Sequence, residues 1–446
     1  MPERPLPTTF RALLGLAMTA SLLSPATSTR AASKVEHVVS EGGIEAYLIH
    51  EPSIPFLSLS LHFRGGSALD PDGKEGLAYM ISGLLDEGAG ELDSQAFRTE
   101  LEDKAIRLSF DATRDAFTGE LKTLTEHRER AFELLGLALT QPRFDAEPVE
   151  RIRSQIQADL RRRSEDPEYV ASLAWFETAF SGHPYGRPMR GTVESVAGID
   201  GSDLRGFVDR RLARDNLVVG VAGDVTAEEL GPLLDQAFGD LPAQSAPIDV
   251  AEALPKGGET VVVRRNLPQS QVMFGESGLK RSDPDFYPAY VANHILGGGG
   301  FTARLTEEVR EKRGLAYSVY SYLYPLDLAP LWLGGAGTDS ARVAETVGLI
   351  RKEVARMASG EVSQAELDDA KTYLTGSFPL RLTGNDPIAS MLVSMQVDDL
   401  GIDYLDRRND YIEAVTLEDL RRAARRLYHP DRLLLVVVGN PRDLQG

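Results

Sequence analysis

Hydrophobic and polar residues alternate along this chain in two different periods. Between Leu57 and Phe63 every second residue is apolar, which is typical of a strand with one buried face. Residues 75–87 instead carry their apolar side chains at helical spacing, so we expect a helix there. Further helices are expected over residues 94–104, 124–140 and 147–164, a buried strand over 218–222 and another strand over 315–322. This mixture of strands and helices predicts an α+β fold.

An internal repeat organises the chain. Asp203-Leu204-Arg205 recurs as Asp419-Leu420-Arg421, and the segment 215–223 recurs at 431–439, both displaced by 216 positions. Two matches at one displacement indicate a duplication. We therefore expect two homologous halves, residues 33–245 and 258–446, each a mainly antiparallel sheet packed with helices. The Pro-, Ala- and Gly-rich residues 246–257 are expected to link them.

The first 32 residues have the order of a secretory signal. Arg4 and Arg11 precede an apolar run at residues 12–23, and small residues follow as far as Ala32. We expect residues 1–31 to be the signal peptide, with cleavage after Ala31 or Ala32. The alternative is a membrane anchor, but the apolar run is shorter than the roughly 20 residues that span a bilayer. An exported, periplasmic protein without membrane insertion is therefore expected.

Charge and composition exclude several classes of function. The net charge of −19 disfavours nucleic-acid binding, which needs basic patches. Cysteine is absent, so no disulfide or thiolate metal site can form. No two of the seven histidines lie three or four positions apart, so no helical pair of histidine ligands is present. A hydrolytic metal site could still assemble from distant residues, and that alternative stays open.

One motif carries more information than the composition. After Gly76-Leu-Ala the chain reads Tyr79-Met-Ile-Ser82-Gly83. The surrounding stretch resembles the insulinase/pitrilysin metallopeptidases, the inverted zincins, which have H-x-x-E-H in this frame. The resemblance extends over nearly the whole chain after the signal. It also includes the segments 183–191, 215–225, 297–319 and 416–431.

The resemblance assigns a role to each motif position. The family's first histidine corresponds to Tyr79, its glutamate base to Ser82 and its second histidine to Gly83. A more distal glutamate ligand falls at about Asp159. Zinc takes imidazole, carboxylate or thiolate ligands, and the first three residues supply none of these. The resemblance therefore implies no cofactor in this chain, with zinc expected in a partner subunit.

Arg310 and Tyr317 are the expected functional pair. In bacterial and mitochondrial branches of the family, a zinc-bearing chain pairs with one that lacks zinc but contributes an arginine and a tyrosine, seven positions apart. A phenol can donate a hydrogen bond to a developing oxyanion, and arginine offers fixed donors to carbonyl or carboxylate groups. Without the resemblance, Arg310 would be a solvated charge ending a helix whose apolar face is Phe301, Leu305 and Val309. Tyr317 would then be strand packing.

A glycine run precedes that pair, at Gly297, Gly298, Gly299 and Gly300. It lacks the Lys-Ser/Thr of a phosphate-binding loop and the spaced glycines of a dinucleotide turn. A hinge, or a close backbone approach to a bound peptide, is favoured. We expect these glycines to contact substrate.

The expected function follows from the resemblance. The halves of family members face each other as a clamshell around an extended peptide. This chain is expected to be the non-catalytic, substrate-binding subunit of an exported zinc metallopeptidase, and to complete the cleft of an H-x-x-E-H partner. The alternatives are a proteolytically inactive peptide-binding or scaffold protein of the same fold, and a hydrolase with an unrecognised metal site.

Overall fold

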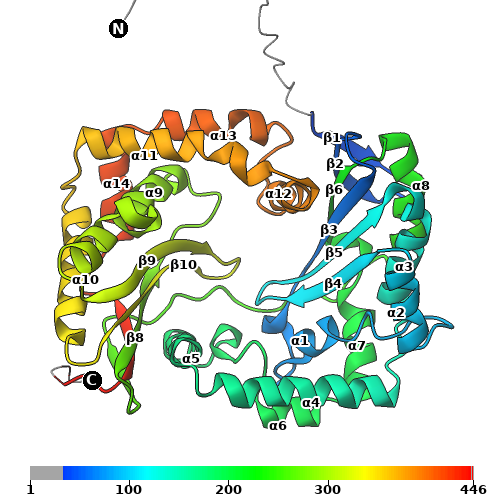
Figure 1. Cartoon of the computed structure of the whole chain (residues 1–446), viewed down its shortest axis with the longest axis horizontal. Coiled ribbons are helices and arrows are strands. Elements are labelled where there is room, and N and C mark those ends of the chain that lie inside the picture. Colours follow the sequence, from blue (N-terminus) through cyan, green and yellow to red (C-terminus); the bar gives the residue numbers. More distant parts are fainter. Residues whose placement is uncertain (1–33, 443, 445–446) are drawn as a thin grey trace, which may run out of the picture. The chain divides into compact units, whose positions relative to one another are not determined.

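The computed structural model describes residues 34–442 and 444. From Lys34 onward the chain forms one compact unit built on two sheets (Figure 1). The strands are β1 Glu36–Val39, β2 Glu45–His50, β3 Phe56–Arg64, β4 Arg107–Ala112, β5 Ala116–Leu124, β6 Leu217–Gly223, β7 Thr260–Arg264, β8 Gln269–Ser277, β9 Ala316–Pro325, β10 Pro330–Asp339 and β11 Leu434–Gly439.

The helices include α1 Leu77–Ser82, α2 Ser94–Asp103, α3 Arg128–Thr140, α4 Ala146–Arg163, α5 Pro167–Ala179, α6 Val193–Gly198, α7 Gly201–Arg211 and α8 Ala227–Phe238. They continue with α9 Phe286–Asn293, α10 Val343–Ala358, α11 Gln364–Gly376, α12 Asn385–Val397, α13 Tyr404–Glu413 and α14 Leu417–Leu427. Shorter 3-10 and π turns lie between them.

The two sheets share one topology. The first has the order β1-β2-β6-β3-β5-β4 and the second β7-β11-β8-β10-β9. In each, a parallel pair (β2 with β6, β7 with β11) is followed by antiparallel neighbours. If β1 is left aside, the two sheets have the same strand order. In each, the strand that comes last in the sequence (β6 or β11) is second in the sheet, and the strand that comes third in the sequence (β4 or β9) lies at the edge. The strands β6 and β11 come from the segments that repeat in the sequence, so the repeat corresponds to equivalent strands.

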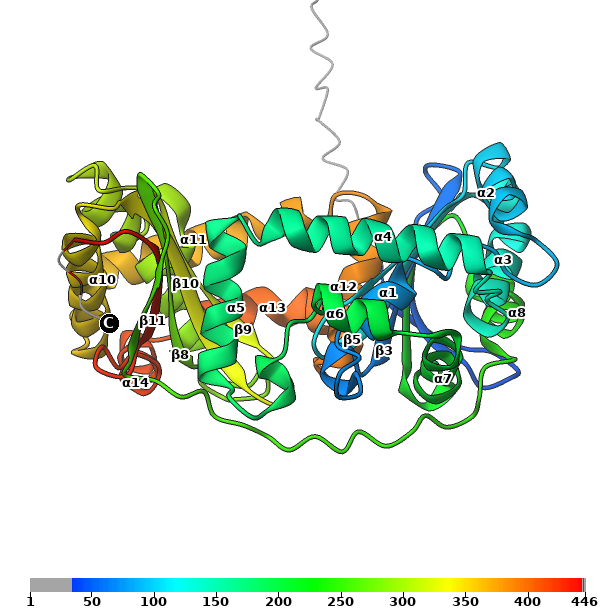
Figure 2. The same ribbon diagram turned by 90° about the horizontal axis from the view of Figure 1, so that it is seen from below.

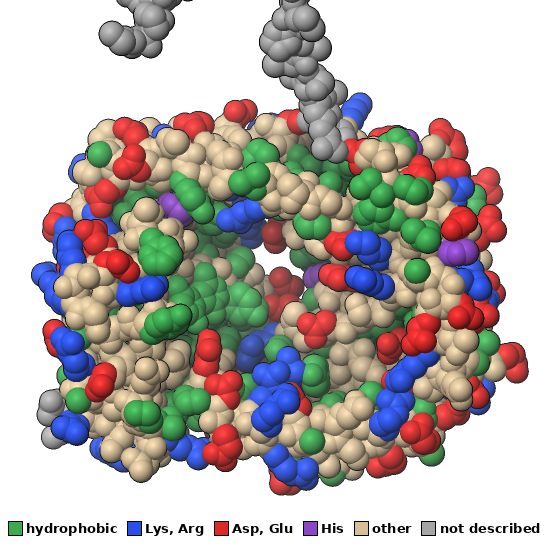
Figure 3. Space-filling model, viewed as in Figure 1, with side chains coloured by type: hydrophobic (Ala, Val, Ile, Leu, Met, Phe, Trp, Pro, Cys, Tyr) green, Lys and Arg blue, Asp and Glu red, His purple; other side chains and the backbone are tan. Residues whose placement is uncertain are grey.

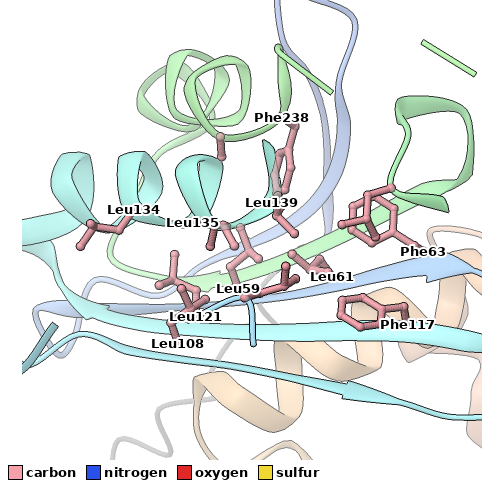
Figure 4. Close-up of a cluster of buried hydrophobic side chains, with 14 of the residues drawn as sticks. Leu59, Leu61, Phe63, Leu108, Phe117, Leu121, Leu134, Leu135, Leu139 and Phe238 are labelled. Atoms are coloured by element: carbon pink, nitrogen blue, oxygen red, sulfur yellow. The ribbon is translucent and has the colours of Figure 1, made fainter. Parts of the chain in front are cut away.

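The first sheet has an apolar core on its helix-covered face. Leu59, Leu61 and Phe63 of β3 alternate inward, as their spacing predicts, and are at most 1% exposed. They meet side chains of α3 and α8, among them Leu135, Leu139 and Phe238 (Figure 4). The second sheet has its own core, in which Phe274 and Trp332 pack against α9, α10, α11 and α14.

Each sheet is closed on its other face by a helix from the opposite half of the sequence. Helix α12 packs across β6 and β3, and α5 packs across β11 and β8 (Figures 1 and 2). The approach of α12 is close, because a Cβ on Gly220 would lie 2.4 Å from the carbonyl oxygen of Ala389. Gln396 Nε2 also donates to Val219 O at 2.8 Å. The two sheets are thus tied by exchanged helices.

The segment between α8 and β7 contains no helix or strand and runs along the surface (Figure 2). Hydrogen bonds hold it to the rest of the chain, among them the following. His183 Nε2 lies 2.9 Å from Ala251 O, Ala253 N donates to Leu328 O at 3.0 Å, and Lys256 N donates to Ala179 O at 2.9 Å. The division of the chain into halves at residues 246–257 stays a prediction.

One predicted element is shorter than expected. The helix predicted over residues 75–87 is regular only over Leu77–Ser82 and ends at Gly83, whose N–H bonds to the carbonyls of Ile81 and Met80. Leu84 and Leu85 are still buried, but in turns. The predicted signal peptide lies outside the described residues. Among the helices that are described, none is long and apolar enough to cross a bilayer.

A buried carboxyl in the second core gives a testable pH dependence. Glu276 on β8 is 5% exposed, and its carboxyl oxygens contact the backbone N–H and the ring Nδ1 of His429 at 2.7 and 2.9 Å. Burial raises the pKa of Glu276 to about 8. A folded-state pKa above the unfolded value means that the protonated group stabilises the fold fully below the unfolded pKa. That stabilisation is lost as pH rises through about 8.

The Glu276→Gln variant is expected to remove this titration. Between pH 4.5 and 9 the wild-type free energy of unfolding should fall relative to that of the variant, by at most about 5 kcal/mol. Guanidinium unfolding of both proteins at several pH values measures the difference. A difference that is constant with pH would contradict the prediction.

Candidate functional site

The degenerate motif lies on α1, whose first turn is fixed by a buried aspartate. Asp70, 4% exposed, accepts hydrogen bonds from the backbone N–H of Gly76 at 2.9 Å and of Ala78 at 3.0 Å. Burial raises the pKa of Asp70 to about 7. These bonds satisfy N–H groups that a helix start leaves without partners. They set the orientation of α1, and with it the directions of Tyr79 and Ser82.

Tyr79 is held by an arginine that the motif does not predict. The guanidinium carbon of Arg190 lies 4.3 Å from the centre of the Tyr79 ring, and Arg190 Nη1 donates to the Tyr79 hydroxyl. The same Nη1 is 3.9 Å from Asp159 Oδ2 on α4. Arg190 therefore bridges the position of the family's first histidine and that of its distal carboxylate.

Asp159 is engaged by further arginines. Arg163 Nε donates to Asp159 Oδ2 at 2.5 Å, and Arg162 Nη2 donates to Oδ1. Burial acts to raise the pKa of Asp159, but the hydrogen bonds from Arg163 and Arg162 outweigh it and hold that pKa below its usual range. The carboxylate is ionised, and both of its oxygens are bound to guanidinium groups.

The two remaining motif positions supply no ligand. Ser82 is 7% exposed, and its hydroxyl donates to the Tyr79 carbonyl oxygen at 2.8 Å. Gly83 ends α1, and a Cβ there would meet Ile152 Cγ2 only at 3.4 Å, so packing alone does not exclude a side chain. Within the described residues no group of three His, Cys, Asp or Glu side chains could hold a metal. The residues at this position do not fit a zinc ion.

The second predicted pair has a different environment. Arg310 lies in the π-helical segment Thr306–Glu311, and Tyr317 is the second residue of β9. The guanidinium carbon is 5.5 Å from the Tyr317 ring centre and 4.8 Å from that of Phe301. Tyr317 is 82% exposed, and the Arg310 side chain is 34% exposed. The structure therefore brings Arg310 and Tyr317 together and leaves both open to solvent.

The prediction that Phe301 belongs to the apolar face of the helix is wrong. Its spacing from Leu305 and Val309 predicts a shared buried face, and those two residues are fully buried. Phe301 is 69% exposed because the helix does not reach it. It lies in the 3-10 turn Gly300–Thr302, and Ala303 is extended before the helical residues begin.

The glycine run divides into two parts. Gly297 is buried in the π-helical turn His294–Gly298, where a Cβ would lie 2.4 Å from Ser321 Oγ, so it allows a close approach to β9. Gly298 and Gly300 are exposed and Gly299 is partly exposed. Gly300 has φ +61° and open space where a Cβ would be. The substrate contacts expected of these glycines stay a prediction.

The two groups of residues are separate. No hydrogen bond, ion pair or ring contact joins the Tyr79–Asp159 group to the Arg310–Tyr317 pair in the part of the chain that the structure describes.

Hydrophobic side chains gather over β9 and β10 in Figure 3, where Tyr320 and Tyr322 are 37% and 40% exposed. Their rings stack with centroids 6.2 Å apart.

Comparison with known proteins identifies the family. Residues 46–193 match the model of "Insulinase (Peptidase family M16)", and residues 198–374 match that of the "Peptidase M16 inactive domain". The chain is 32% identical over 341 residues to the non-peptidase homolog YmxG of Helicobacter pylori, covering 76% of this chain and 78% of that protein. The chain belongs to the insulinase family, M16. It is a homologue that lacks the family's metal-binding motif.

Other M16 relatives include a subunit by name. The chain is 24% identical over 354 residues to the mitochondrial-processing peptidase subunit beta of Saccharomyces cerevisiae, with 76% of each chain covered. Among solved structures, an M16 inactive domain from Pseudomonas fluorescens matches with a TM-score of 0.86 and 28% identity. That match covers 93% of this chain and 99% of the other. The α+β fold with two helix-packed sheets is therefore the M16 fold.

Arg190 and Arg163 are the residues that sequence reasoning missed. Arg190 belongs to the His183–Gly191 loop, one of the segments that resemble the M16 family, but the family pattern gives it no role. It lies 111 positions from Tyr79, so no local spacing could connect them. The sequence nevertheless contained a sign of these contacts. The motif lacks metal ligands, and basic residues lie close in sequence to the distal carboxylate of Asp159.

Restoring the motif alone is not expected to restore zinc binding. In a Tyr79→His, Ser82→Glu, Gly83→His variant, the Arg190 and Arg163 cations still occupy Asp159 and repel a divalent ion. Adding Arg190→Ala should strengthen zinc affinity about fivefold or more, since one removed cation contact is worth about 1 kcal/mol or more. Calorimetric titration with zinc measures this affinity. The matched control is Arg161→Ala, which removes an exposed arginine from α4, the helix that carries Asp159 and Arg163. Equal affinity with and without Arg190 would contradict the prediction.

Proposed function

We propose that this chain is the non-catalytic, substrate-binding subunit of an exported zinc metallopeptidase, and that it completes the peptide cleft of an M16 partner bearing H-x-x-E-H. One observation carries the proposal. Arginines bind Asp159 at the position of the family's distal ligand, while Tyr317 stays exposed and Arg310 stays partly exposed beside it. A chain that only preserved its fold would have no need to keep that second pair together and uncovered.

The chemistry of the pair suits a contributing subunit. Arg310 can donate to a peptide carbonyl, and the Tyr317 phenol can donate to the oxyanion of a tetrahedral intermediate. Neither group can activate water by itself. Zinc, the activating base and the nucleophile therefore come from the partner, and the extended peptide lies between the two chains.

Two comparisons support a multi-subunit setting. The mitochondrial-processing peptidase relative is a subunit by name. A structure titled Complex III2 from Candida albicans shares the fold, with a TM-score of 0.77 and 18% identity. The second of these also favours the alternative function, an inactive scaffold of the same fold, because that structure is named as a complex and not as a peptidase.

The test is reconstitution. The chain is purified alone and together with an M16 protein from the same genome that has an intact H-x-x-E-H. We expect the chain alone to bind no stoichiometric zinc and to cut no peptide from a casein digest. The complex should cut peptides faster than the partner alone. Zinc and activity in the isolated chain would overturn the proposal, and a complex no faster than the partner would favour the scaffold.

Export has a separate test. A copy carrying residues 1–446 is expressed in a Gram-negative host, and the periplasmic and cytoplasmic fractions are compared by mass spectrometry. The periplasmic form is expected to begin at Ala32 or Ser33. A full-length cytoplasmic product would contradict the proposed location.

A further inference from the structure

Phe301 is an exposed aromatic residue with a defined contact. Its side chain is 69% exposed, which places it outside both cores. The ring nevertheless lies 4.8 Å from the guanidinium carbon of Arg310, within cation–π distance. The ring of Phe301 thus contacts a residue of the proposed site.

The turn that carries Phe301 is fixed at both ends. On one side Gly297 packs against Ser321 of β9, leaving no space for a Cβ. On the other side Ala303 is 1% exposed, and its N–H donates to the carbonyl of Gly300 at 3.2 Å. Thr302 Oγ1 donates to Gly299 O at 3.0 Å within the turn. The backbone therefore determines where the ring projects.

The acidic neighbours of Arg310 are mostly occupied by other cations. Lys312 Nζ lies 2.9 Å from Glu307 and 2.6 Å from Glu308, and Arg313 Nη1 lies 2.6 Å from Glu308. Hydrogen bonds from Lys312 and Arg313 lower the pKa of Glu308 to about 2, so it stays ionised and paired. Glu311 alone contacts Arg310, at 3.4 Å. The Arg310 guanidinium therefore contacts the rings of Phe301 and Tyr317 and forms one weak ion pair, with Glu311.

We propose that Phe301 is a positioning residue, which holds the Arg310 guanidinium beside Tyr317 so that both can donate to one peptide group. The inference rests on the proposed function, since it assigns Arg310 and Tyr317 to substrate. It also links the glycine run to the site, because Phe301 directly follows Gly300.

The experiment compares Phe301→Leu with Phe301→Tyr. Leucine keeps an apolar side chain without a π face, and tyrosine keeps the ring. In the reconstituted complex, Phe301→Leu should lower kcat about threefold to fivefold with little change in KM, and Phe301→Tyr should restore kcat. In an Arg310→Ala background, Phe301→Leu should have no further effect, since coupled residues are not additive. Equal effects in both backgrounds, or failure of tyrosine to restore kcat, would overturn the inference.

A second measurement needs no partner. In the isolated full chain, ring current from Phe301 should shift the side-chain NMR signals of Arg310, and Phe301→Leu should remove that shift while Phe301→Tyr preserves it. No change with leucine would overturn the inference. If Arg310→Ala leaves turnover unaltered while the NMR shift behaves as expected, then the proposed function fails and the position assigned to Phe301 stands.

Discussion

The Arg310→Ala variant is expected to lower kcat/KM of the reconstituted complex about 100-fold. A preorganised donor at a developing oxyanion or substrate carbonyl is commonly worth 100-fold or more in rate. Tyr317→Phe, which removes only the hydroxyl that would donate to the oxyanion, should cost about 100-fold for the same reason. Cleavage of a fluorogenic peptide, measured at several substrate concentrations, separates kcat from KM.

A matched control is available on the same half of the chain. Tyr373 on α11 is 58% exposed and stacks on His294, with ring centroids 5.0 Å apart. Tyr373→Phe removes a solvent-exposed hydroxyl outside the pair and should leave turnover unchanged. If Arg310→Ala behaves like this control, with full turnover in an intact complex, the chain acts as a scaffold.

The Trp175→Ala variant is expected to lower the free energy of unfolding by about 4 kcal/mol, the usual cost of truncating a fully buried tryptophan. Trp175 on α5 is 0% exposed, its ring is 5.2 Å from that of Phe176, and its Nε1 donates to Leu434 O at 3.2 Å. It packs with Leu434, Val436 and Val438 of β11, so its loss leaves a cavity between α5 and the second sheet.

Guanidinium unfolding followed by circular dichroism measures this cost. Trp175→Phe, which keeps most of the apolar volume and loses the hydrogen bond, should cost about 1.5 kcal/mol and serves as the graded control. A loss below 1 kcal/mol for the alanine variant would contradict the tight packing of α5 on the second sheet.

Much of the fold could be predicted from the sequence because its signals are local. Alternation in β3 and helical spacing in α2 and α4 reproduce those elements to within about two residues, the usual uncertainty of element ends. The repeat at a displacement of 216 identifies β6 and β11 as equivalent strands. The exchange of α5 and α12 was not predicted, since an apolar helix face does not reveal which of two similar sheets it covers.

The site was predictable in composition and less so in geometry. The loss of zinc ligands at Tyr79, Ser82 and Gly83 can be read directly from the chain. The contact between Arg190 and Tyr79 depends on the fold, because it joins a loop to a helix far away in sequence. Phe301 was misassigned for a different reason. Its spacing assumed one continuous helix, whereas Phe301 lies in a 3-10 turn that ends at the extended residue Ala303, so the helix does not reach it.

The exchanged helices have a consequence for how such a protein can change over evolutionary time. Because α12 covers the first sheet and α5 the second, the two sheets with their flanking segments are not interchangeable parts. A recombination event that replaced one half by that of a relative would separate a sheet from the helix fitted to it. The unit that must stay together is therefore a sheet with the helix that covers it, although two distant stretches of the gene encode them.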